Sequence, residues 1–336
     1  MEENSMQELV CFQESDIEFD CRVPILDNNN TNTTNPRQTR RAVRRGSCSR
    51  VQRIFWKVRN LVVAYKEVVL WREDCLTDVT ESSRVIRQIQ AKRREGGEAD
   101  ACPYLLLYYA LRVMDTHHYQ WLMEWVEDSL LDLIKNKAFK KEVVCGRVAR
   151  QLVEALRFLH VEVGLVHGDV SLANILVLSN PGKVAENYED RGEGGGEEER
   201  SHFITRLGDL EACSPAGILP KCFHGTFLFA APEALAHRVE TADFSVDVWS
   251  VGIVVCMLLS GGKHPFLTRE KPTFWDILDS LNNAKTLNLR AHFKAFLPGV
   301  SEAAIEFICG CLSWEPAERL STTQLLQLPW LSQCVG

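Results

Sequence analysis

The chain has 336 residues and a net charge of −7, with 46% hydrophobic and 25% charged residues. This composition is typical of a globular protein, and the length allows one large domain or two lobes. The acidic balance gives no sign of nucleic-acid binding, and no apolar run approaches the roughly 20 residues that a membrane helix needs. Because the N-terminus also lacks the pattern of a signal peptide, we expect a cytoplasmic or nuclear protein.

The beginning of the chain has the composition of a disordered tail. Residues 1–36 are acidic and then polar, and they end in a run rich in Asn and Thr. Such a stretch cannot bury enough apolar surface to offset the entropy lost on ordering. The basic run over residues 37–50 is more typical of a solvated patch than of a nuclear address. We therefore predict a disordered tail, acidic and then basic, over residues 1–43.

Strand patterns dominate the next part of the chain. Alternating and Val-rich segments flank a turn at Arg59-Asn60, which is the pattern of two paired strands. The predicted elements are strands over 51–58, 61–70, 104–112 and 119–126 and a helix over 81–94.

Helical periodicity dominates after residue 130. Apolar residues from Val144 to Leu159 recur at steps of three and four, which predicts one long amphipathic helix. A stretch over 181–201 is rich in Gly and Glu, and its like charges favour an exposed loop. Strands thus precede helices, which predicts an α+β fold with a small β-rich lobe and a larger helical lobe. The further predicted helices cover residues 246–259, 273–281, 302–312 and 322–328.

The strongest chemical pattern lies directly after the long predicted helix. In His167-Gly168-Asp169, the Asp is followed five residues later by Asn174 and then by an apolar strand. A carboxylate can orient a hydroxyl group and accept its proton, while an amide oxygen can hold Mg²⁺. An Asp and an Asn are also common in an ordinary turn between a helix and a strand. The segment resembles the catalytic loop of protein kinases, H-R-D-L-x-x-x-N.

A second segment with an acidic end follows in the order expected for protein kinases. The apolar stretch Ile204 to Leu207 leads to Asp209, which stands where these kinases have the Asp of D-F-G. The resemblance implies that Asp209 binds Mg²⁺. Leu210 and Glu211 replace the Phe and the Gly of that motif.

Three later residues resemble structural positions of the same family. Glu233 ends the sequence Ala-Pro-Glu, and Asp247 opens a D-x-W-x-x-G pattern fourteen residues later. Arg319 stands near the end of the chain. The resemblance implies that Arg319 pairs with Glu233 and that Asp247 bonds the backbone of the catalytic loop. All three roles support the fold rather than the activity.

The predicted strands contain a looser match to the nucleotide-binding lobe. Ala64 and Lys66 lie in Val-Ala-Tyr-Lys, which resembles V-A-I-K, whose Lys binds the α- and β-phosphates of ATP. Val51, fifteen residues before Lys66, stands where a valine closes the Gly-rich loop. Gly46 matches the middle glycine of that loop, and the other two glycines are replaced.

The segment Met-Glu-Trp-Val over 123–126 resembles the hinge between the two kinase lobes. The resemblance implies that Met123 is the gatekeeper residue. It also implies that backbone groups of Glu124 and Val126 bond adenine.

Several positions depart from the family pattern. Gly168 replaces the Arg that docks an activation-loop phosphate in many kinases. Ser171 replaces the Lys that neutralises the transferred phosphoryl group. The glutamate that pairs with Lys66 in the family is represented by either Glu81 or Gln88, and the sequence leaves both open.

The resemblance as a whole implies an ATP- and Mg²⁺-dependent protein kinase acting on Ser or Thr of a protein substrate. It assigns the small lobe to residues 44–126 and the large lobe to residues 127–331. The alternative is a pseudokinase that serves as a nucleotide-binding or scaffold module. The implied catalytic residues are Asp169, Lys66, Asn174 and Asp209, with Asn174 and Asp209 as metal ligands. The implied nucleotide-binding residues are Gly46, Val51, Ala64, Lys66, Met123, Glu124 and Val126.

Overall fold

The computed structural model contains two compact units of the chain. The small unit comprises Met1–Ala91 and Leu106–Glu127, and the large unit comprises Lys92–Leu105 and Asp128–Gly336. Gly46 and the predicted loop over 181–201 lie outside the described residues. Among the residues that are described, no helix is long and apolar enough to cross a membrane. The structure describes residues 10–19, 43–45, 49–70, 79–95, 102–134, 141–179, 203–217, 225–235, 243–269 and 271–333.

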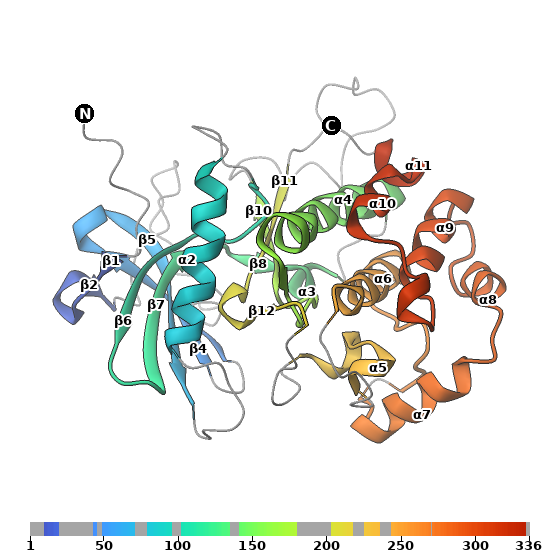
Figure 1. Cartoon of the computed structure of the whole chain (residues 1–336), viewed down its shortest axis with the longest axis horizontal. Coiled ribbons are helices and arrows are strands. Elements are labelled where there is room, and N and C mark those ends of the chain that lie inside the picture. Colours follow the sequence, from blue (N-terminus) through green and yellow to red (C-terminus); the bar gives the residue numbers. More distant parts are fainter. Residues whose placement is uncertain are drawn as a thin grey trace, which may run out of the picture. The chain divides into compact units, whose positions relative to one another are not determined.

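The small unit is built on one sheet with the strand order β1-β6-β7-β5-β4-β2, and β3 also pairs with β4 (Figure 1). The hairpin of β4 and β5 turns at Asn60, whose φ of 51° lies in the left-handed region that Asn tolerates. Helix α2 buries Val85, Ile86 and Ile89. The elements are β1 (Val10–Cys11), β2 (Ile17–Glu18), β3 (Val43–Arg45), β4 (Ser49–Trp56), β5 (Leu61–Val69), α2 (Val79–Glu95), β6 (Tyr108–Val113) and β7 (His118–Glu124).

The prediction of a disordered tail over residues 1–43 is wrong for residues 10–19. Strand β1 pairs in parallel with β6, and β2 pairs antiparallel with β4. Phe12 lies between the two strands and is only 2% exposed. Ile17 lies in β2 and is only 5% exposed. Two apolar side chains in an acidic stretch produce no periodicity, and so this pairing leaves no pattern in the sequence.

The predicted strand over 104–112 is shorter in the structure and begins at Tyr108. Tyr104 and Leu105, the first two residues of the predicted range, belong to the large unit. There the N–H of Leu207 donates to the carbonyl of Tyr104 at 2.8 Å, and Leu105 forms an isolated bridge with Leu207. Backbone pairing with a distant segment therefore ends the strand.

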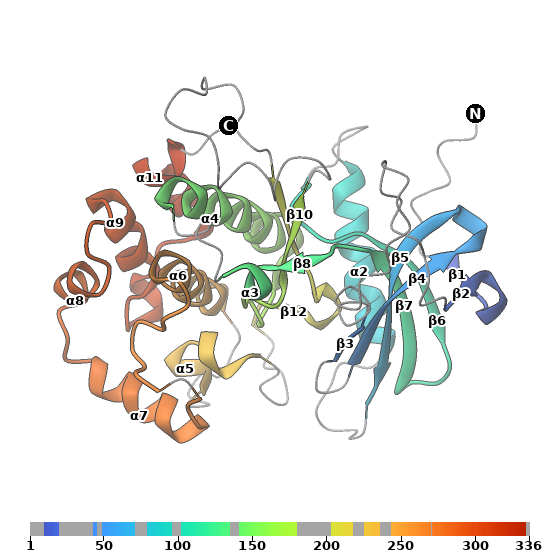
Figure 2. The same cartoon turned by 180° about the vertical axis from the view of Figure 1, so that it is seen from behind.

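The large unit confirms the predicted run of helices, which Figure 2 shows from behind. Its long helix α4 continues as a π-helical turn over Phe158–Val163, which ends at Gly164 with a φ of 78°. Together with the small unit, it gives the predicted α+β fold. Its elements are β8 (Asp128–Ser129), α3 (Leu130–Leu133), α4 (Glu142–Arg157), β9 (Leu165–Val166), β10 (Ile175–Ser179), β11 (Phe203–Leu207), β12 (Ser214–Pro215), α5 (Pro232–Leu235), α6 (Ser245–Ser260), α7 (Phe274–Ala284), α8 (Leu289–Phe296), α9 (Glu302–Cys311), α10 (Thr322–Gln327) and α11 (Pro329–Ser332).

Helix α6 forms the centre of the large unit, and its residues are buried on almost every side. At Gly252 an added Cβ would lie 2.6 Å from Cγ of Leu312, so the glycine permits close packing at this point. The loop between β9 and β10 carries Asp169 and Asn174, and Asp209 follows the end of β11, whereas the fourth predicted catalytic residue, Lys66, lies on β5 of the small unit.

Candidate active site

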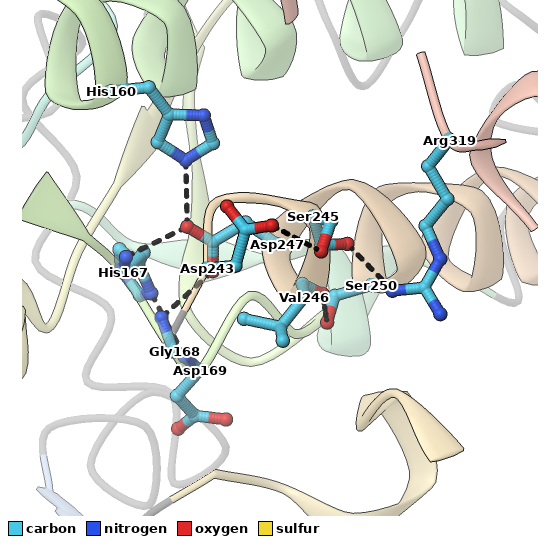
Figure 3. A network of polar contacts seen from close by, with 10 residues as sticks. All are labelled: His160, His167, Gly168, Asp169, Asp243, Ser245, Val246, Asp247, Ser250 and Arg319. Carbon is cyan, nitrogen blue, oxygen red and sulfur yellow. Dashed lines mark hydrogen bonds and ion pairs between the residues drawn. The ribbon is translucent and has the colours of Figure 1, made fainter. Parts of the chain in front are cut away.

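The predicted catalytic loop is held by Asp247 of α6, which is fully buried (Figure 3). Its carboxylate accepts hydrogen bonds from the backbone N–H groups of His167 and Gly168, each at 2.8 Å. A third bond, also of 2.8 Å, joins it to Nε2 of His160. The role predicted for Asp247, bonding the loop backbone, is therefore confirmed.

The same contacts determine the charge state of Asp247. Burial alone would raise the pKa of this carboxyl group, but the hydrogen bond and charge of His160, with a smaller contribution from His167, bring the pKa below its ordinary value. A buried carboxylate that accepts several hydrogen bonds stays ionised in this way. Asp247 is thus a fixed negative charge beneath the loop.

His167 connects the catalytic loop to the end of β11. The backbone N–H of Asp169 donates to Nδ1 of His167 at 3.2 Å, and so Nε2 is the ring nitrogen that carries the proton. Nε2 lies 2.8 Å from the carbonyl oxygen of Gly208, to which it donates. This hydrogen bond ties Gly208, the residue before Asp209, to His167 of the catalytic loop.

The carboxylate of Asp169 is fixed on both of its oxygens. Nδ2 of Asn174 donates to Oδ2 at 2.9 Å, and the backbone N–H of Thr226 donates to Oδ1 at 2.7 Å. Burial raises the pKa of Asp169, the negative charge of Asp209 raises it further, and the bonds from Thr226 partly oppose this rise. The structure therefore brings Asp169, Asn174 and Asp209 together at one place in the large unit, and their catalytic roles stay a prediction.

Asn174 and Asp209 supply atoms that suit a magnesium ion. Nδ2 of Asn174 is used by Asp169, and its Oδ1 is the side-chain atom left to bind a cation. Asp209 follows β11 with a φ of 62°, a left-handed conformation that is uncommon outside glycine. The described residues contain no group of three or more His, Cys, Asp or Glu that could hold a metal ion. A pair of oxygen ligands fits Mg²⁺, which usually keeps water and phosphate oxygens as its other ligands.

The predicted pair of Glu233 and Arg319 is present and nearly buried. Nη2 of Arg319 donates to Oε2 of Glu233 at 2.8 Å, and Nη1 donates to the second carboxylate oxygen. The same guanidinium donates to the carbonyl groups of Ser313 and Ser245 at 2.9 and 3.0 Å. It also lies over the ring of Trp249, 5.0 Å from the ring centroid.

In the small unit, the strand register brings the predicted nucleotide-facing side chains to one face of the sheet. Val51 pairs with Lys66 across β4 and β5, and Ala64 pairs with Met123 across β5 and β7. Directly paired residues point to the same face, and so do residues two apart in one strand. Lys66 is 9% exposed. The backbone N–H of Glu124 donates to the carbonyl of Leu107 at 2.8 Å.

The two candidates for the partner of Lys66 lie on α2 and share a contact. Nε of Arg84 donates to Glu81 at 2.8 Å, and Nη1 of Arg84 donates to Gln88 at 3.4 Å. The choice between Glu81 and Gln88 stays a prediction.

The geometry of the loop agrees with the comparison of the whole sequence with known families. The family model described as "Protein kinase domain" matches residues 38–331. The chain belongs to the protein kinase family. The match covers the catalytic loop, the end of β11 and the Glu233–Arg319 pair.

Curated relatives in this family include ribosomal protein S6 kinase alpha-4 from Mus musculus and Homo sapiens. The chain is 31% identical to each over 207 residues, which is 60% of this chain and 24% of each relative. It is 27% identical over 300 residues to mitogen-activated protein kinase kinase 5 from Leishmania mexicana, which is 87% of this chain and 49% of that relative. The aligned segment thus spans less than half the length of the relatives it matches.

Two features of this kinase-family site were not foreseen from the sequence. His160 contributes to holding Asp247, yet a single His late in a helical pattern gives no signal of that role. Glu211, at the position of the D-F-G glycine, is 5% exposed, although Glu is mostly found on protein surfaces. The role of His160 depends on a contact with a residue 87 positions away in the sequence.

Gly168, at the position of the docking Arg in other kinases, has a φ of 76°. An added Cβ would meet nothing within 4 Å, so space does not restrict this position. The left-handed backbone itself favours glycine here.

Proposed function

We propose that this chain is an active Ser/Thr protein kinase that transfers the γ-phosphate of ATP to a hydroxyl group of a protein substrate. The observation that carries the proposal is the half-buried Asp169 carboxylate, fixed by Asn174 and Thr226 beside the charge of Asp209. This arrangement matches the need of phosphoryl transfer for a positioned carboxylate next to a metal site.

Asp169 would orient the substrate hydroxyl and accept its proton. Its raised pKa favours this role, since a base works best when its pKa approaches the working pH. Asn174 and Asp209 would hold Mg²⁺, which supplies neutralisation of the phosphate charge when it is bound. Lys66, on the shared face of β4, β5 and β7, would contact the α- and β-phosphates.

Specificity for Ser or Thr is supported by the Gly225-Thr226 pair, which resembles the substrate-facing loop of that branch. The N–H of Thr226 is bonded to Asp169, so this loop meets the proposed base directly. A protein substrate is supported by the Ala-Pro-Glu segment and by the names of the relatives, which are protein kinases.

A pseudokinase is the second candidate, and two observations favour it. Glu211 adds a buried carboxyl group where kinases have glycine. Ser171 replaces the phosphate-neutralising Lys, and its buried hydroxyl group makes no hydrogen bond to the described residues. A chain with these changes could bind nucleotide and signal through its shape.

The two candidates are separated by incubating the purified chain with Mg-ATP labelled in the γ-phosphate, together with a generic protein acceptor. Transfer to Ser or Thr is expected from the wild type. Asp169→Asn should lower kcat by roughly 10²–10⁴ while the melting temperature is kept. Asp243→Asn, which changes an exposed acid of the same unit, is the matched control.

Nucleotide binding without any transfer would support the pseudokinase instead. An Asp169→Asn chain that stays within a few-fold of the wild type would show that Asp169 is not the base. Phosphoamino-acid analysis of the product tests the Ser/Thr specificity, and phosphotyrosine as the main product would contradict it.

A further inference from the structure

A short segment at the beginning of the chain connects the two edges of the sheet in the small unit. We call Val10–Phe19 the N-terminal strap. Its first strand, β1, lies along β6, and its second strand, β2, lies along β4, with a short 3-10 turn over Glu14–Asp16 between them (Figure 1). The match to the protein kinase domain begins only at residue 38, so the strap lies outside it.

The strap fills a part of the sheet edge that the neighbouring strand leaves open. Strand β3, which directly precedes Gly46, pairs only with Arg50–Gln52 of β4. Strand β2 pairs with the other end of β4, where Ile17 faces Trp56. The outer edge of β4 is therefore covered in two pieces that come from separate segments of the chain.

The strap is anchored by apolar side chains on one face of the sheet. Phe12 and Ile17 are buried in a cluster with Trp56 and Tyr65, from β4 and β5. The ring of Phe19 meets the ring of Tyr65 edge-on, with the centroids 5.1 Å apart. These contacts fix the ends of the strap to the two strands that carry the predicted nucleotide-facing residues.

The opposite face of the same strands carries Val51, Ala64 and Lys66. Successive side chains of a strand point to opposite faces, and Tyr65 directly precedes Lys66. A shift of β5 beneath the strap must therefore also move Lys66. The strap and the predicted phosphate contact are joined through one strand, without intervening elements.

The strap is held to the sheet by short strands and few buried side chains. Its two strands have two residues each. Side chains between its anchors, such as Gln13 and Ser15, are exposed. Ordering such a segment costs conformational entropy at every residue, and only a few buried groups offset that cost. Segments of this kind open more readily than the strands they cover.

We propose that the strap is a separable element that docks on β4 and β5 and sets the affinity of the small unit for nucleotide. The docking stands on the strand pairing and the apolar cluster, whereas the effect on nucleotide rests on the proposed function. Because coupling between two sites is reciprocal, bound nucleotide stabilises the docked strap by the same factor. The strap is a positioning element, since its buried side chains pack on the face of the sheet opposite the predicted nucleotide-facing side chains.

The test uses the full chain with the double substitution Phe12→Ala and Ile17→Ala, and Ser15→Ala as the matched control at an exposed strap position. Hydrogen exchange of the backbone amides in β4 and β5 should become faster in the double variant only. The Kd for Mg-ADP should rise by about fivefold or more in that variant. The KM for ATP should rise with it, while kcat stays within about twofold.

A peptide with the sequence of Val10–Phe19, carrying a fluorescent label, tests separability. It should bind the double variant, whose own strap is weakened, and lower its Kd for Mg-ADP towards the wild-type value. It should not bind the wild-type chain, and a peptide with both alanines should not bind either.

Unchanged exchange in β4 and β5, or failure of the peptide to bind the double variant, would overturn the docking of a separable strap. An unchanged Kd in a variant with faster exchange would overturn the coupling to nucleotide. If the wild type itself binds no Mg-ADP, the proposed function fails, whereas exchange and peptide binding still decide whether the strap docks.

Discussion

Replacement of Asp247 by Asn tests how the catalytic loop is held. The asparagine has nearly the same shape as the aspartate but carries no charge. Its NH₂ group, itself a donor, would face one of the N–H donors of His160, His167 and Gly168. Hydrogen bonds to a buried charge contribute about 1.5–3 kcal/mol each, and removing one partner of a buried ionic network costs about 3–5 kcal/mol. We expect a loss of about 3–5 kcal/mol in the free energy of unfolding, near the upper end of what one substitution does.

The assay is urea or thermal unfolding followed by circular dichroism, where about 2–4 °C is lost per kcal/mol for a unit of this size. Asp243→Asn is the matched control, because Asp243 is exposed and its carboxylate accepts a long hydrogen bond of 3.4 Å from the hydroxyl group of Ser245. A loss below about 1 kcal/mol for Asp247→Asn, or an equal loss in the control, would refute the role of the buried charge.

The pH dependence of this difference follows from the lowered pKa of Asp247 in the folded chain. A carboxyl group of this kind stabilises the fold above its unfolded pKa of about 3.9, and the stabilisation is lost as the pH falls through the folded value. The stability gap between the wild type and Asp247→Asn should therefore narrow below about pH 4. A gap that stays constant down to the acid transition would contradict this assignment.

Three other substitutions and one enzymatic treatment have defined expected outcomes. Asp209→Asn should abolish most of the Mg²⁺ dependence of nucleotide affinity, measured by titration calorimetry, and a normal Mg²⁺ dependence would place the metal elsewhere. Gly252→Ala should cost about 1–3 kcal/mol in unfolding experiments, because the new Cβ would lie 2.6 Å from Leu312, and an unchanged stability would show that α6 and α9 can separate freely. Because Gly168 cannot dock a phosphate, phosphatase treatment and Ser214→Ala should each leave kcat/KM nearly unchanged, and phosphatase sensitivity that disappears in Ser214→Ala would overturn this.

The sequence allowed the parts of the fold that depend on local patterns to be predicted. The Val-rich run over 61–70 became β5, and the apolar stripe from Val144 to Leu159 became the buried face of α4 and its π-helical extension. The turn between β4 and β5 was also predictable, because Asn tolerates the left-handed conformation that Asn60 adopts there. Asp169 could be identified because motifs place it at a fixed spacing from Asn174.

Contacts between distant segments could not be predicted in this way. The strap has two-residue strands, whose pairing is decided by the burial of Phe12 and Ile17 against β4 and β5. His160 binds Asp247 across 87 residues of sequence. In each case the contact partner lies far away in the sequence. Neither the residue types nor the hydrophobic periodicity of the local segment indicates that partner.

The pair of Glu233 and Arg319 also bears on how the chain folds during synthesis. The two residues are separated by 86 positions, and Arg319 lies within the last helical part of the large unit. A chain emerging from the ribosome makes Glu233 several seconds before Arg319, at about 5–20 residues per second. In that interval the Ala-Pro-Glu segment has no guanidinium partner from Arg319. The nascent large unit therefore forms this ion pair only after Arg319 has been made, and until then the Ala-Pro-Glu segment is held by its other contacts.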